Sequence, residues 1–198
     1  MAAPGVTISR KLNVVLPPFE TKDHGRVYVH SVPIGRATFE SCFRPMARAM
    51  SSIITEGIGP ITGPSVAALI LQQEADAIGE GEAIKTGVML DIKRNTNIIL
   101  ADKADTIPYA VAMQRNLLDE DQQSEVENLL VYFTLVSWIR LPPDLAVRLG
   151  LEGLRTLWNV QITSLGTTEF MNSLKTSTPV ANTGERPTTS TPPSSIAA

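Results

Sequence analysis

The chain has 198 residues, of which 43% are hydrophobic and 19% charged, and its formal net charge is −3. This length is enough for one substantial core or two small ones. Lysine and arginine are scattered along the chain, and no basic run is longer than a pair such as Lys93-Arg94. Domains that bind nucleic acid usually carry a clustered basic patch, so the charge pattern argues against nucleic acid as a partner.

A single cysteine, Cys42, makes an intramolecular disulfide impossible and fits a reducing compartment. Residues 1–10 lack the charged and apolar regions of a signal peptide, and we expect them to form a flexible N-terminus. The protein is therefore expected in the cytoplasm of the cell that makes it.

Two short valine-rich segments, 11–16 and 26–32, alternate in part between apolar and polar residues. Pro17, Pro18 and the turn signal Asp23-His24-Gly25 lie between them. This pattern predicts the two strands of an N-terminal β-hairpin with a long connection. Because a two-stranded hairpin is marginally stable in water, it must pack on helices.

Apolar residues then recur at helical spacing from Phe39 to Ile54. Pro45 lies inside this stripe and should kink or divide the helix near Cys42. The glycines and prolines of 57–64 predict a loop, which precedes an alanine-rich helix over 65–78.

Shorter elements are expected in the rest of the chain. The spacing of apolar residues predicts a helix over 84–92 and another over 106–116. Between them, 95–103 is polar at its ends and is expected to form a loop around a short apolar run. Helical pieces are expected between Leu145 and Trp158, and a last turn or two over 169–174.

Residues 126–139 are apolar on nearly every face of a helix. Asp119, with Gln122 three residues later, has the spacing of a capping box and would start this helix, which should end near Arg140. Such a helix must be covered all round. Its apolar run from Leu129 to Ile139 has eleven residues, whereas spanning a bilayer takes roughly 20. The cover is therefore expected to be protein, either the chain's own core or a partner, and not a membrane.

Serine, threonine and proline occupy fourteen of the 23 positions from 176 to 198, and no aromatic residue occurs there. Such a segment cannot bury enough apolar surface to offset its ordering entropy. We therefore expect a single mainly helical domain over 11–175, which includes the N-terminal β-hairpin, followed by a disordered tail over 176–198.

No group of residues predicts a catalytic, cofactor or metal site. The Gly57–Gly63 loop precedes a helix whose N-terminal amides could face a phosphate, but it lacks a Gly-Lys-Ser/Thr ending and a preceding strand. A structural connection is the better interpretation. His24, His30 and Cys42 fall short of the four ligands that a zinc site needs, so both histidines are expected to be ordinary surface or half-buried residues. The chain is not expected to be an enzyme.

Acidic residues cluster at 119–121, Glu125 and Glu127. Acids favour a helix N-terminus through the macrodipole, and the loop spacing of a calcium site is absent. Helix-spaced aromatic residues pack in a core or form a binding hot spot, in which tryptophan and tyrosine are enriched. Both roles stay open for Tyr132, Phe133, Trp138 and Trp158.

Several segments of the chain follow one another in a characteristic order. Tyr28-Val-His-Ser-Val-Pro-Ile-Gly-Arg-Ala-Thr-Phe-Glu lies near the N-terminus, and an alanine-rich helix and Asp91-Ile-Lys-Arg-Asn-Thr follow it. Leu118-Asp-Glu-Asp precedes the Asn128-Leu-Leu-Val-Tyr-Phe-Thr helix, and Ser164-Leu-Gly-Thr-Thr-Glu-Phe-Met-Asn-Ser-Leu precedes the polar tail. In this order of features, from about residue 27 to 178, the chain resembles the tail assembly chaperones of long-tailed bacteriophages.

The resemblance implies a mainly helical protein without enzymatic activity that binds the long helical tape measure protein and keeps it soluble. It also implies recruitment of tail tube subunits, action in the host cytoplasm and absence from the finished virion. Many genes of this family make a longer second product by ribosomal frameshifting, and the segment after Thr176 resembles the place where such a product would differ. Pro45 departs from the family pattern and leaves the geometry of its helix open. Whether the protein also associates with copies of itself stays open as well.

An unassembled tape measure exposes apolar helical faces, which aggregate unless they are covered. A chaperone that coats them needs shallow apolar grooves, and adaptable methionines are one way to build such grooves, although methionine is also a common core filler. The chain spreads five of them along its length: Met46, Met50, Met89, Met113 and Met171. The main rival is a structural minor tail or head–tail joining protein of a virion, and the second is a small-molecule enzyme that uses the Gly57–Gly63 loop.

Overall fold

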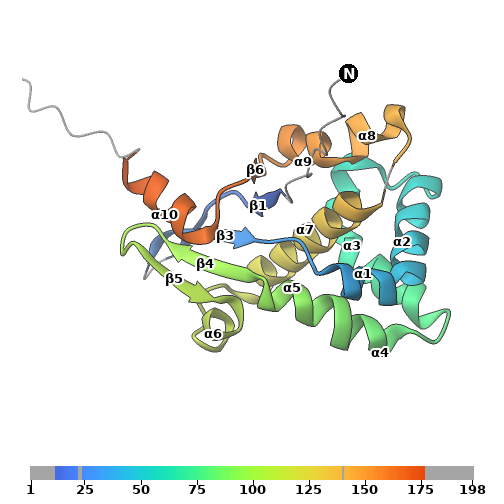
Figure 1. The fold of residues 1–198 in the computed structure, drawn as a ribbon, viewed down its shortest axis with the longest axis horizontal. Coiled ribbons are helices and arrows are strands. Elements are labelled where there is room, and N and C mark those ends of the chain that lie inside the picture. Colours follow the sequence, from blue (N-terminus) through green and yellow to red (C-terminus); the bar gives the residue numbers. More distant parts are fainter. Residues whose placement is uncertain (1–11, 22–23, 140, 177–198) are drawn as a thin grey trace, which may run out of the picture.

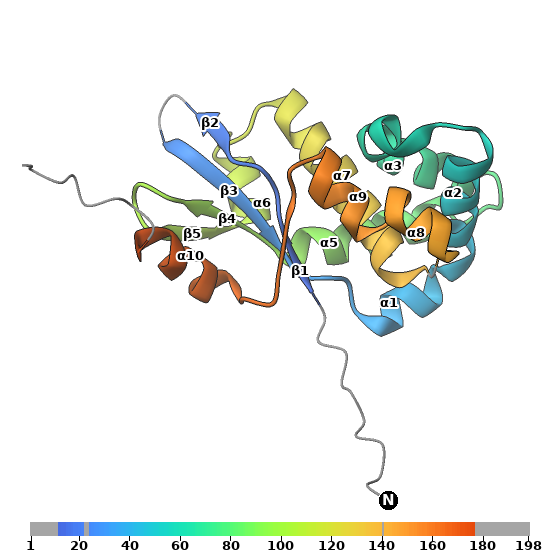
Figure 2. The ribbon, with the colours of Figure 1, turned by 90° about the horizontal axis from the view of Figure 1, so that it is seen from above.

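The structure, a computed structural model, describes residues 12–21, 24–139 and 141–176. A six-stranded antiparallel sheet separates two unequal layers (Figure 2): most of the helices pack on one face, and the C-terminal helix α10 (Thr167–Thr176) covers the other. The prediction of a mainly helical protein is confirmed. The flexible termini predicted for 1–10 and 176–198 lie outside the described residues, apart from Thr176, which ends α10.

The sheet runs in the order β5-β4-β3-β1-β6, and β2 pairs with β3 on the same side as β1. Every pairing is antiparallel. The strands are β1 (Asn13–Val15), β2 (Phe19–Thr21), β3 (Gly25–Ser31), β4 (Thr96–Leu100), β5 (Asp105–Pro108) and β6 (Gln161–Thr163).

The prediction of an N-terminal hairpin over 11–16 and 26–32 is wrong, because it gave two strands of a larger sheet as an isolated pair. β1 and β3 do pair, with Val14 opposite Ser31, but they belong to a six-stranded sheet. The predicted loop over 95–103 contains β4, because pairing with β3 satisfies its backbone while its apolar residues are buried. Strand β6 returns beside β1, so residues from opposite ends of the domain share one sheet.

The two faces of the sheet carry different apolar groups. Val29 and Ile98 point towards the helices and belong to the main core. Ile99, one position along β4, points the other way and packs with Phe170 of α10 in a second, small cluster. The alternation of side chains along a strand thus places α10 and the helical layer on opposite faces.

The other helices form the larger layer, most of it at the opposite end of the molecule from β5 (Figure 1). One segment, Ile84–Met89, is a π-helix between α4 and α5. The α-helices are α1 (Arg36–Ser41), α2 (Phe43–Thr55), α3 (Gly59–Asp76), α4 (Gly81–Ala83), α5 (Leu90–Arg94), α6 (Tyr109–Gln114), α7 (Glu120–Trp138), α8 (Pro143–Leu149) and α9 (Leu151–Leu157).

Prolines and glycines divide the first helices. The break predicted near Cys42 is confirmed, because α1 ends at Ser41 and α2 begins at Phe43. Pro45 then lies in the first turn of α2, where a missing N–H costs no helical hydrogen bond. The loop predicted over 57–64 is too long: α3 begins at Gly59, and Pro64 lies inside it.

Helix α7 is the centre of the main core. Its predicted capping box is present: the Asp119 carboxylate accepts from Gln122 N at 2.8 Å, and Asp119 N donates to the Gln122 side chain at 3.2 Å. Every residue from Leu129 to Leu135 is buried. Helices α2, α3 and α9 pack against α7, so the all-round cover that its sequence requires comes from the chain's own core.

Replacing Phe133, whose side chain is 1% exposed in the middle of α7, should destabilise the domain strongly. Phe133→Ala is expected to lower the free energy of unfolding by about 3–5 kcal/mol, because the lost apolar burial and the cavity both contribute. Chemical denaturation followed by tryptophan fluorescence measures the change. Phe43→Ala is the matched control, since Phe43 is 51% exposed, and should change stability far less. Equal losses in the two variants would contradict this assignment of the core.

Candidate interaction surface

An apolar hollow lies between the end of α2, the α2–α3 turn and α8. Its volume is about 260 Å³. Most of its wall is aliphatic or glycine, and Arg148 is its one charged lining residue. The lining residues are Ile53, Ile54, Gly57, Gly59, Leu145, Arg148 and Leu149. A concave apolar surface with a charged rim suits the insertion of an apolar side chain from a partner.

Two glycines shape one wall of this hollow. Gly57 and Gly59 have φ values of +66° and +73°, which side-chain-bearing residues rarely adopt. A Cβ atom at either position would meet no atom within 4 Å. The turn therefore requires glycine for its backbone conformation and not for lack of space, and the absence of side chains leaves the hollow open.

Tyr132 holds Leu149, one of the residues that line the hollow. Its hydroxyl donates to the Leu149 carbonyl at 2.8 Å in a buried hydrogen bond, which ties α7 to the end of α8. Burial raises the pKa of Tyr132 to about 12, so this phenol stays protonated and remains a donor near neutral pH. On α3, a Cβ atom at Gly63 would lie 3.2 Å from the Tyr132 ring, so this glycine lets α3 approach closely.

Large apolar side chains are exposed on the neighbouring helices. Ile61 and Leu69 of α3 are 68% and 57% exposed, and Leu157 of α9 is 51% exposed. Helices α3 and α9 pack against each other. The hollow and these three side chains all belong to the helical layer, and together they are called the apolar end of the molecule. Exposed apolar surface of this kind is typical of protein-binding sites.

The sequence did not single out this surface. Ile61 fell in the predicted loop, and Leu69 stood in an alanine-rich helix with apolar residues on several sides. Leu69 precedes the buried Ile70 and Leu71, so the pattern alone could not tell which of the three faces solvent. Only the packing of α3 against α2 and α7 decides it.

The structure places the four aromatic residues that the sequence assigned to either the core or a binding hot spot. Tyr132 and Phe133 are core residues, each 1% exposed. Trp138 is half-buried, and its ring stacks on Phe39 with centroids 4.6 Å apart. Trp158 is also half-buried and packs against the main core. A hot spot formed by all four aromatic residues is therefore wrong.

The two histidines lie in different environments. His24 is partly exposed and its Nδ1 accepts from the Lys103 ammonium at 3.0 Å. His30 is fully buried on β3, which goes beyond the half-buried position expected for it. Within the described ranges, no cluster of three or more His, Cys, Asp or Glu side chains is arranged to hold a metal ion.

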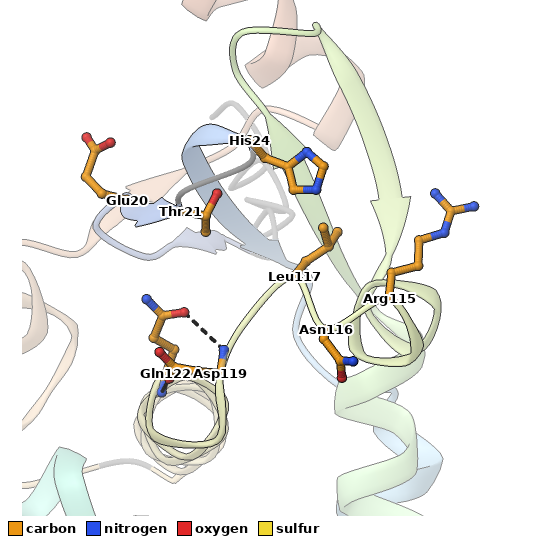
Figure 3. Close-up of a pocket in the computed structure, with 8 residues that line it drawn as sticks. All are labelled: Glu20, Thr21, His24, Arg115, Asn116, Leu117, Asp119 and Gln122. Atoms are coloured by element: carbon orange, nitrogen blue, oxygen red, sulfur yellow. Dashed lines mark hydrogen bonds between the residues drawn. The ribbon is translucent and has the colours of Figure 1, made fainter.

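A second hollow, of about 280 Å³, lies between the β2–β3 hairpin and the α6–α7 connection (Figure 3). Two of its polar groups serve the fold: Asp119 caps α7, and the Thr21 hydroxyl donates to Gly25 O at 3.2 Å. Arg115 points away from the other side chains. Catalysis by a nucleophile requires a general base within hydrogen-bonding reach, an arrangement that these lining residues do not form.

The acidic residues around the start of α7 have structural partners. Asp119 forms the cap, and Glu120 and Asp121 lie in the first turn, where acids complement the helix dipole. Glu127 pairs with Lys93 at 3.0 Å and accepts from the Tyr109 hydroxyl at 3.3 Å. Burial, followed by the nearby Glu127 charge, raises the pKa of Tyr109 well above its usual value.

The Gly57–Gly63 segment forms the turn after α2 and the first turn of α3, which begins at Gly59. It follows a helix, whereas a dinucleotide site places its glycine-rich turn after a strand.

Comparison with protein-family models, curated protein sequences and solved structures finds no match to this chain. Among residues 12–21, 24–139 and 141–176, no helix is both long and apolar enough to cross a membrane.

Removing the hydroxyl of Tyr132 tests whether its hydrogen bond to Leu149 stabilises the fold. Tyr132→Phe leaves the Leu149 carbonyl without its buried donor, and we expect a loss of about 1–3 kcal/mol in the free energy of unfolding. Urea denaturation measures this loss. Unchanged stability would show that another donor reaches the Leu149 carbonyl and that this bond does not hold α8 in place.

Proposed function

We propose that this protein is a tail assembly chaperone of a long-tailed bacteriophage, which binds the tape measure protein and keeps it soluble during tail assembly. The observation that carries this proposal is the apolar end of the molecule, which comprises the hollow and the exposed aliphatic side chains on α3 and α9. The resemblance of the sequence to this family supplies the identity of the partner. Recruitment of tail tube subunits and absence from the finished virion belong to the same proposal.

The chemistry of the apolar end suits an amphipathic helix as partner. Helices that bind in grooves insert apolar side chains spaced three or four residues apart. The hollow would receive one such side chain, while Ile61 and Leu69 supply apolar contact along α3. Arg148 on the rim is exposed and would pair with an acidic residue on the partner's polar face.

A structural protein of the virion is the alternative function. A virion component would use the same apolar surface for a permanent contact, so geometry alone does not separate the two roles. Their locations do: a component is present in purified particles at a defined stoichiometry, whereas an assembly chaperone is absent from them.

Co-expression tests the proposal directly. The tape measure protein from the same gene cluster is expected to be insoluble alone and to co-purify in soluble form with this chain. Because the contact is largely apolar, the complex should persist in high salt, unlike a complex driven by phosphate contacts. A tape measure that stays insoluble, or this chain in mature particles at fixed stoichiometry, would reject the chaperone function.

Introducing a charge on α3 locates the contact. Ile61→Glu places a carboxylate on the apolar end at a position that is 68% exposed, so the fold should tolerate it while the tape measure protein is lost from the soluble fraction. Thr62→Glu is the matched control, because Thr62 is also exposed and is its neighbour on α3. Circular dichroism should show equal folding of both variants. Equal recovery of the tape measure with both would place the contact elsewhere on the protein.

A further inference from the structure

A group of polar side chains attaches the lead-in to α10 to the outer face of the sheet. The Leu165 carbonyl accepts two hydrogen bonds, from Asn13 Nδ2 at 2.8 Å and from His30 Nε2 at 3.1 Å. The Thr167 hydroxyl lies 3.1 Å from His30 Nδ1 and accepts from Asn97 Nδ2 at 3.5 Å. One side chain from each of three adjacent strands therefore holds this segment.

The bond to Leu165 assigns the tautomer of the neutral His30 ring. A carbonyl oxygen only accepts, so Nε2 carries the proton that reaches Leu165. In the neutral ring, Nδ1 is then the acceptor for the Thr167 hydroxyl proton. The neutral imidazole uses both ring nitrogens, and its side chain is fully buried beneath α10.

Helix α10 packs on a core of its own. Phe170 is buried with Val15 and Ile99 in the small cluster on the outer face of the sheet. The Phe170 ring also lies 6.0 Å from Tyr28 and 6.1 Å from the His30 ring, centroid to centroid. The main core, which surrounds α7, contains no described residue of α10. Loss of α10 would therefore leave the apolar contacts of the helical layer in place.

We propose that α10 is a detachable cap, and that protonation of His30 releases it from the sheet while the rest of the domain stays folded. A proton on Nδ1 turns this nitrogen into a donor, so the Thr167 hydroxyl must turn from donor to acceptor to keep the contact. The resulting positive charge would be buried under Phe170. Opening hydrates the imidazolium and exposes an apolar strip of the sheet that includes Val15, Tyr28 and Ile99.

Among the described residues, no charged group packs around His30 to neutralise this charge, and the backbone bonds to Leu165 and to its own residue offset the cost of burial only in part. Its neighbours across the two adjoining strands are Val15 and Asn97, which are uncharged. On α10, the exposed Glu169 accepts from Gly166 N at 2.9 Å and thereby caps its own helix. No ion pair joins His30 to any side chain in the described part of the chain.

The direction of the pH effect follows from burial. Burial lowers the pKa of His30 below its ordinary value of 6.5, and the bond to Leu165 opposes this only in part. The closed form therefore binds fewer protons than the open form. Above pH 6.5 the closed form keeps its full stability relative to the open form. This stability is lost progressively as the pH falls towards the lowered pKa.

Hydrogen exchange of the full chain, corrected for the intrinsic pH dependence of exchange, measures the opening of α10. Between pH 7.5 and pH 5.0, protection of the α10 amides is expected to fall by up to about thirtyfold, the limit set by one linked proton with an open-state pKa of about 6.5. Protection of the α7 amides should not change. Constant protection of α10, or parallel loss in α10 and α7, would overturn the proposal.

The two histidines of the chain supply matched variants. His30→Gln keeps an amide donor for Leu165 but does not titrate, so the pH dependence of α10 protection should disappear. His24→Gln, which lies just before β3, should keep the pH dependence of α10 protection. Retention of the full pH dependence in His30→Gln would overturn the proposal.

A second pair of variants tests the cap without replacing His30. Thr167→Val removes the hydroxyl that binds Nδ1 and should lower α10 protection at pH 7.5 while α7 protection is unchanged. Thr168→Val, at the exposed next position, should leave α10 protection as it is. The same protection in both variants, or equal losses in α10 and α7, would show that the Thr167–His30 bond does not hold the cap.

Discussion

The complete burial of α7 is the constraint on which the rest of this structure depends. Seven consecutive residues, Leu129 to Leu135, are buried, and this run leaves no face of the helix for solvent. Both hydroxyls of this run have partners: Thr134 donates to the Leu130 carbonyl within the helix at 2.7 Å, and Tyr132 donates to the Leu149 carbonyl at 2.8 Å. Helices α2, α3 and α9 and the inner face of the sheet surround it. The first turn is acidic and exposed, so α7 runs from solvent into the centre of the core.

The two ends of the molecule differ in how their apolar surface is covered. On the outer face of the sheet, α10 covers Ile99 and Val15, and polar bonds from three strands hold its first residues. At the helical end, no described element covers Ile61 or Leu69. The two glycines of the α2–α3 turn keep the adjoining hollow open, because they contribute no side chain to fill it. The most exposed of the large apolar side chains, Ile61 and Leu69, thus lie at the helical end, which is why the proposed partner contact is placed there.

Local signals predicted those features whose cause lies within a few residues. The capping box at Asp119 joins residues three apart, and the break before Pro45 follows from the geometry of the proline ring. Strands β2, β4, β5 and β6 were missed, and β5 occupies the start of the helix predicted over 106–116. A short run such as β4 or β6 becomes a strand only when a distant strand pairs with it. The exposed side of α3 was missed for a related reason: Leu69, Ile70 and Leu71 are alike in sequence and differ only in what packs on them.

By itself, the sequence determined that 126–139 is a helix needing cover on all sides, that this cover is protein and that helices predominate. Only the tertiary structure decided that the cover is the chain's own core, that the sheet has six strands and that His30 is buried beneath α10. The physical reason is the range of the interactions. The residues that bind the Leu165 carbonyl, His30 and Asn13, lie 135 and 152 positions away along the chain. No local pattern records such a pairing, because it arises from strand order and from the alternation of side chains across the sheet.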